Sequence, residues 1–146
     1  MRGLTLSARH FDRHYWVGHI GDRDVTVLER TDTLSFPRKK DRQYKWTIMQ
    51  FDLSKTAVPH LFIDANHYDE TFYSNLFITH TDLKNYNHLF ANSPAYDKQF
   101  TNHFKVYADQ HHRSDVVLPL TPIIINTLEH HFRMFDYELF DDKLLV

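Results

Sequence analysis

Histidine is the residue type whose number most suggests chemistry, because twelve of the 146 residues are histidine. The imidazole ring is the commonest nitrogen ligand for zinc and other transition metals, and its charge changes near neutral pH. Neither an H-E-x-x-H motif nor an H-x-H pair occurs, so spacing alone assembles no metal site. Part of one could come from Asp64 with His60 and His67, or from His111 and His112. Scattered surface and half-buried histidines are the simpler interpretation.

Other catalytic patterns give no nucleophile and no phosphate loop. The chain contains no cysteine, which excludes thiolate sites and disulfides, and it has neither a G-x-S-x-G nor an S-x-x-K motif. Its three glycines, Gly3, Gly18 and Gly21, form no nucleotide-binding pattern. The spacing of the carboxylates singles out no acid and base pair. We therefore predict no catalytic residue and no cofactor, and we favour a protein that is not an enzyme.

A basic segment near the end of the first third is the other candidate binding feature. Arg38, Lys39, Lys40 and Arg42 follow Pro37 in a segment that should be an exposed loop between two strands. Such a loop could contact phosphate groups or an anionic membrane, where each basic side chain contributes about 1 kcal/mol. A solvated loop is the simpler interpretation. The formal net charge of −2 offers no field for a polyanion, so we expect no nucleic-acid partner.

The elements that must position these residues are mostly strands. Residues 15–20 and 23–29 flank Gly21-Asp22, which predicts a hairpin with a type II′ turn. Alternation over 42–53 places Tyr44, Trp46 and Ile48 on one face, which we expect to face the core. Shorter strands are predicted at 59–65 and 104–108. Residues 66–95 mix polar and aromatic side chains, and one short helix near 83–90 is the most they indicate.

The last third combines a helix and a hairpin. Thr121-Pro122 is a typical helix start, and the helix should run to about Phe132. Its apolar stripe of Ile124, Leu128 and Phe132, with Ile125 beside them, should face a sheet, with Glu129, His130 and Arg133 facing outward. Residues 135–140 and 143–146 then form a hairpin around Asp141-Asp142. The predicted fold class is α+β in one domain, 1–146: a mainly antiparallel curved sheet or two-sheet body with a C-terminal amphipathic helix followed by a β-hairpin.

Several segments in this order resemble a family of uncharacterised bacterial proteins, often attached to transmembrane helices. The matching motifs are the F-x-V-Y-A strand in FTNHFKVYA (Phe100 to Ala108), the L-T-P helix start at Leu120, and the closing YELFDDKLL from Tyr137. Weaker matches include the P-H-x-x-I-D-A element at Pro59. The resemblance implies a shared fold, a cytoplasmic location and, in the natural protein, a membrane anchor upstream. It implies no reaction, because these residues pack and pair strands.

Within that resemblance, His60 and Asp64 are the matched residues that we take as ligand-binding candidates, together with Arg38, Lys39, Lys40 and Arg42. His60 and Asp64 should stand about 13 Å apart on one face of a strand, which is too far for direct contact. The leading hypothesis is a non-catalytic binding or regulatory module of a membrane-associated protein, which contacts a protein partner or a membrane surface through loops and strand edges. The alternative is a metal-dependent hydrolase that binds zinc or manganese at a His/Asp site assembled in the fold. The sequence does not determine the oligomeric state.

Overall fold

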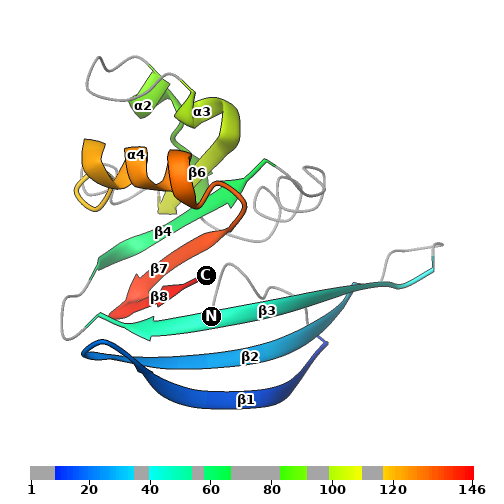
Figure 1. Ribbon diagram of the computed structural model, residues 1–146. Helices are drawn as coiled ribbons and strands as arrows, with labels where there is room; N and C mark the ends of the chain where they lie inside the picture. The colour runs from blue at the N-terminus through cyan, green and yellow to red at the C-terminus, as the bar shows by residue number, and fades with distance from the viewer. Residues whose placement is uncertain (1–8, 35–39, 54–57, 67–82, 92–98, 110–116) are drawn as a thin grey trace.

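The chain folds into one sheet with short helices on one side (Figure 1). A computed structural model describes residues 9–34, 40–53, 58–66, 83–91, 99–109 and 117–146. In chain order the elements are β1 (His10–Ile20), β2 (Arg23–Leu34), β3 (Arg42–Asp52), β4 (Val58–Ala65), β5 (Leu83–Asn85), α2 (His88–Ala91), α3 (Phe100–His103), β6 (Phe104–Asp109), α4 (Pro122–His131), β7 (Tyr137–Asp141) and β8 (Lys143–Leu145).

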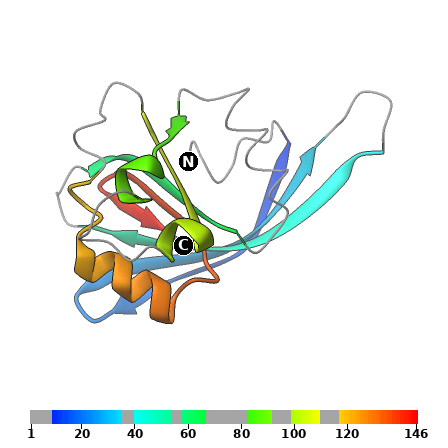
Figure 2. The same ribbon diagram turned by 90° about the horizontal axis from the view of Figure 1, so that it is seen from above.

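The described strands form an eight-stranded sheet in the order β1-β2-β3-β8-β7-β4-β6-β5. Every neighbouring pair is antiparallel. The long strands β1 to β3 bend along their length (Figure 2). The predicted α+β class with a mainly antiparallel, curved sheet is therefore confirmed. The described strands form one sheet and not two. β8 pairs with both β3 and β7, which brings the end of the chain to the middle of the sheet.

Two-residue turns close two hairpins of the sheet. Ile20 pairs with Arg23 around Gly21-Asp22, and Gly21 has a φ of 64°, which glycine adopts without strain. A positive φ at the first turn residue but not at the second is the φ pattern of the expected type II′ turn. In the C-terminal hairpin Phe140 pairs with Lys143, and Asp141 takes a φ of 54°. Aspartate tolerates this left-handed conformation better than most side chains.

The helices cover one face of the sheet, which we call the helix face. Phe100 of α3 packs between Phe90 of α2 and Phe104 of β6, with ring centroids 5.7 and 5.1 Å away. Apolar burial of this kind is the main force that holds the helices on the sheet. The buried cluster contains Leu61, Ile63, Ala65, Tyr86, Phe90, Phe100, Phe104, Val106, Ala108, Leu120, Ile125, Leu128 and Tyr137.

Helix α4 packs with only part of the expected stripe. The hydroxyl of Thr121 caps its start by accepting a hydrogen bond from the N–H of Ile124. Ile125, Leu128 and Glu129 are its buried residues, whereas Ile124 and Phe132 are exposed. The predictions that Ile124 and Phe132 face the sheet and that Glu129 faces outward are wrong. Glu129 turns inward because its carboxylate pairs with His103 at the end of α3.

Candidate functional site

The face of the sheet opposite the helices carries a second, smaller apolar cluster. Directly opposed residues in neighbouring strands have their side chains on the same face, so the register assigns each residue to a face. Leu28 opposes Ile48, and Glu138 opposes both Leu145 and Phe62. We call the face of the sheet opposite the helices the polar face, because of the charged residues described next. Its buried apolar residues are Leu28, Ile48, Phe62, Leu83, Tyr107 and Leu145.

Buried charges concentrate on the polar face. The described part of the chain buries five polar or charged residues, and four of them belong to this face by register: Arg30, Asp32, Asp64 and Glu138. Glu129 of α4 is the fifth. A buried charge is costly unless it is paired or hydrogen-bonded, so such groups gather where the fold needs them for a specific contact. This face therefore carries most of the buried charge in the described part of the chain.

His60 and Glu138 form a buried acid and base pair on the polar face. His60 lies at a bulge in β4, because two residues separate Val58 from Leu61 whereas only Phe140 separates their partners Asp141 and Leu139 in β7. Its Nε2 is 2.7 Å from Oε1 of Glu138, whose side chain is 0% exposed. The Phe140 ring and the imidazole pack in a T-shaped arrangement, with ring centroids 5.1 Å apart. The carboxylate fixes the orientation of the imidazole and leaves Nδ1 as the ring's other nitrogen.

The structure brings His60 together with Glu138 and not with Asp64, the other sequence candidate. Asp64 is buried on the same face, near the far end of β4 and opposite Lys105. Glu138 is 78 residues from His60 in the chain, and no local pattern joins the two. The sequence did contain one signal of a buried carboxylate. Glu138 lies in a strand between Tyr137 and Leu139, with apolar residues on both sides of it.

The other described histidines are dispersed, and those with carboxylate partners each have a different one. His14 lies 2.8 Å from Glu29, His19 lies 2.6 Å from Asp24, and His103 contacts Glu129. Within the described ranges no group of three or more His, Cys, Asp and Glu side chains could hold a metal ion. His67, His111 and His112 lie outside the described residues. The zinc or manganese alternative stays a prediction.

Most of the basic segment lies outside the described part of the chain. Arg38 and Lys39 are not described, Lys40 is exposed, and Arg42 is the first residue of β3, opposite Leu34 of β2. The segment lies between β2 and β3 in the chain, and the predicted exposed loop falls mostly outside the described residues. Its contact with phosphate or an anionic membrane stays a prediction.

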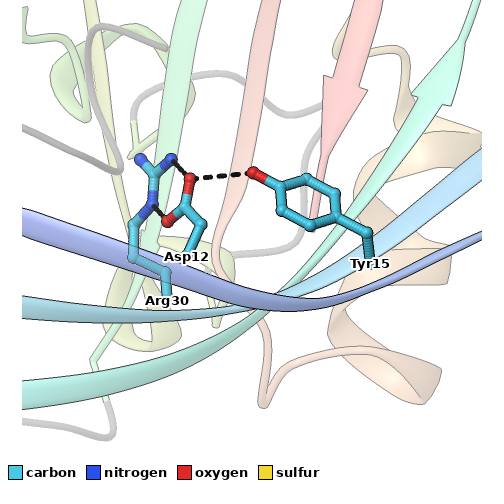
Figure 3. Close-up of polar contacts among 3 residues, drawn as sticks. All are labelled: Asp12, Tyr15 and Arg30. Atoms are coloured by element: carbon cyan, nitrogen blue, oxygen red, sulfur yellow. Dashed lines mark hydrogen bonds and ion pairs between the residues drawn. The ribbon is translucent and has the colours of Figure 1, made fainter.

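At the other end of the polar face, Arg30 of β2 holds Asp12 of β1 through two hydrogen bonds (Figure 3). The two residues are directly opposed, and Nε and Nη2 of Arg30 each donate to one carboxylate oxygen at 2.6 Å. The hydroxyl of Tyr15 donates to the same carboxylate at 3.1 Å. This two-point pairing fixes β1 on β2 with a defined register. The hydrogen bonds from Arg30, and its positive charge, hold the pKa of Asp12 below its usual value.

We expect Asp12→Asn to lower the free energy of unfolding by about 2 kcal/mol at pH 7, because Arg30 loses a charged partner. A carboxyl group whose pKa is lowered by folding stabilises the protein above its unfolded pKa. That contribution disappears as the pH falls through the folded pKa. The difference between wild type and variant should therefore stay constant down to about pH 4 and shrink below it. Urea unfolding at a series of pH values measures this, and a difference that persists unchanged to pH 2 would contradict the pairing.

Strand β1 is an edge of the sheet with an unusually apolar exposed surface. Every residue from His10 to Ile20 is exposed except Asp12, which is half-buried. His14 has a φ of 51° at a bulge between Arg13 and Trp16. An exposed edge strand presents backbone groups that can pair with another chain. Its exposed large apolar side chains are Phe11, Tyr15, Trp16, Val17 and Ile20, with Val17 80% exposed.

The backbone of β1 alternates between groups bonded to β2 and groups directed away from it. The N–H of Thr33 in β2 donates to the carbonyl of Arg9. In an antiparallel pair every second residue bonds to the neighbouring strand, so the odd-numbered residues of β2 direct their N–H and C=O groups toward β1. Through the register past the bulge, Trp16, Gly18 and Ile20 fall at hydrogen-bonded positions. Val17 and His19 therefore direct their N–H and C=O groups away from β2, toward the edge.

These features can be compared with known proteins. None of the helices within the described ranges is long and apolar enough to cross a membrane. The resemblance to a membrane-attached bacterial family rests on β4, β6, α4 and the C-terminal hairpin, and it stays a prediction. No protein-family model, no curated protein and no solved structure matches this chain.

Proposed function

We propose that this protein is a non-catalytic binding module that takes an extended segment of a partner protein as an added strand on β1. The observation that supports the proposal most is the exposed edge, from Trp16 to Ile20, with large apolar side chains and outward backbone groups. Strand addition uses main-chain hydrogen bonds for affinity and alternate side chains for specificity. An edge with these properties is a liability unless a partner covers it.

The bulge at His14 limits where the added strand can lie. A bulge bends its strand and interrupts regular pairing, so a partner strand should pair beyond it, over residues 16–20. In that stretch Trp16 and Ile20 point to one face of the sheet, and Val17 to the other. The expected ligand is therefore a short β-prone segment with apolar side chains at alternate positions. The resemblance to membrane-attached bacterial proteins would place the module at the cytoplasmic face of a membrane.

A displayed library of random unstructured peptides tests this proposal, because it samples many possible partner sequences at once. Peptides selected on the wild-type protein should be rich in β-branched and aromatic residues, and Val17→Lys should weaken their binding at least tenfold because it places a charge in the pairing edge. Ile123→Lys is the matched control, since Ile123 of α4 is 77% exposed and Val17 is 80% exposed. Binding that ignores Val17→Lys, or a selection that yields no binder, would overturn the proposal.

A further inference from the structure

The exposed edge of β1 has a sequence that fits a second copy of itself. Past the bulge, the backbone groups of Val17 and His19 point outward, and the ligand expected there is a short β-prone segment with apolar side chains at alternate positions. Residues 16–20, with the sequence WVGHI, meet this description, because Trp16 and Ile20 lie on the same face of the strand. The same five residues can therefore be both the receptor and the ligand.

One antiparallel register uses both outward residues of each copy. In an added antiparallel strand, a residue whose groups point outward must oppose another such residue. Val17 against Val17, or His19 against His19, therefore gives one hydrogen-bonded pair within residues 16–20. Val17 of each copy against His19 of the other gives two such pairs, each with two N–H···O bonds. This register forms the most main-chain bonds, and its two-fold axis passes between the two copies of Gly18.

The same register places large apolar side chains opposite each other. Trp16 of each copy opposes Ile20 of the other, on one face of the joined sheet. Cross-strand pairs of an aromatic and a β-branched side chain stabilise a sheet. In the single chain Trp16 is 54% exposed and Ile20 is 57% exposed, so both have apolar surface left to bury. The pairing would therefore cover the apolar residues that make this edge unusual.

The ends of the paired stretch carry complementary charges. Antiparallel pairing brings the turn of each copy beside the bulge of the other. The turn presents Asp22, whose side chain is 94% exposed, and the bulge presents the exposed Arg13. Opposite charges at the rim of a contact favour the matching register. Figure 1 shows β1 at one edge of the sheet and the helices over the other end, so no described helix or strand stands in the way of a second copy.

We propose that β1 of a second copy occupies this edge when no partner segment is bound, and that a partner binds by displacing it. The inference rests on the proposed function, since both need β1 to accept a strand. Five residues from each copy are far fewer than the roughly 20–30 a side of a standard interface, so this dimer should be weak and separate on dilution. Such pairing protects an exposed edge from random association and still yields to a tighter ligand.

Single cysteines can trap the proposed register, because the chain has no cysteine of its own. The Cα atoms of the two Gly18 residues would be about 4.5 Å apart, a distance that a disulfide spans. A Cβ at Gly18 would meet no atom of the described residues within 4 Å, so Gly18→Cys should fold normally. Under mild oxidation with glutathione, Gly18→Cys should form linked dimers at least tenfold faster than Ile123→Cys, the control for random collision at an exposed site.

Val17→Cys tests the register, because its thiols would meet only if Val17 opposed Val17. It should link no faster than Ile123→Cys, and the tightest selected peptide should slow the linking of Gly18→Cys. The inference is wrong if Gly18→Cys links no faster than Ile123→Cys, or if Val17→Cys links faster than Gly18→Cys. Peptide binding to the edge would in either case leave the proposed function in place. Fast linking of Gly18→Cys with no peptide binder in the library would support self-association and overturn the partner-binding function.

Discussion

Phe62→Ala should lower the free energy of unfolding by about 4 kcal/mol, because it removes a large side chain from the centre of the polar face and leaves a cavity. Phe62 is 0% exposed, and its ring lies 6.3 Å from that of Tyr107 in the neighbouring strand. The result would show that the polar face is a packed interior and not a solvated surface. Urea unfolding measures the loss through the shift of its midpoint.

Phe135→Ala is the control for this prediction, because Phe135 is 49% exposed. Replacement of an exposed side chain usually changes stability by no more than about 0.5 kcal/mol. If Phe62→Ala cost no more than Phe135→Ala, the polar face would not be the packed interior described above.

Arg30→Met should destabilise the fold by about 3 kcal/mol, because it leaves the Asp12 carboxylate without its cation in a partly buried position. The Arg30 side chain is 7% exposed and that of Asp12 is 17% exposed. Most of this loss in stability comes from the Asp12 carboxylate that is left unpaired. The double variant Arg30→Met with Asp12→Leu should therefore recover part of the stability. Thermal and urea unfolding of the four proteins in this cycle gives the coupling free energy between the two residues.

Arg13→Met is the matched control for Arg30→Met. Arg13 lies on the same hairpin and is exposed, with its guanidinium 4.9 Å from the centre of the Phe11 ring. Its replacement should cost less than about 1 kcal/mol. Equal losses for Arg13→Met and Arg30→Met, or additive losses in the double variant, would contradict the central role of the Arg30–Asp12 pair in holding β1.

The general character of the fold could be predicted because local patterns determine it. Alternation over residues 42–53 placed Tyr44, Trp46 and Ile48 on one face, and Ile48 is buried there, with Trp46 packed beside it. The turn at Gly21-Asp22 followed from a two-residue linker that begins with glycine between two β-prone runs, and glycine adopts the positive φ found there without strain. These signals act over two to twelve residues. They therefore reveal strands and turns, but not the order in which the strands pair.

Long-range pairing explains what the sequence did not reveal. The pairing of β8 with β3, and the contact of His60 with Glu138, join residues that are more than half the chain apart. Helix α4 shows the same limit on a smaller scale. Its pattern indicated that Glu129 faces solvent, because helical periodicity ranks side chains by polarity and does not include a buried partner such as His103.

The central claim is that β1 accepts an added strand, and hydrogen exchange of its amides tests it most directly. With the tightest selected peptide bound, exchange measured by NMR should slow at Val17 and His19, whose N–H groups point away from β2. Exchange at Gly18, which already pairs with β2, should change little. That alternating pattern is the signature of a new strand on this edge. Uniform slowing along β1, or protection confined to another element, would contradict the account.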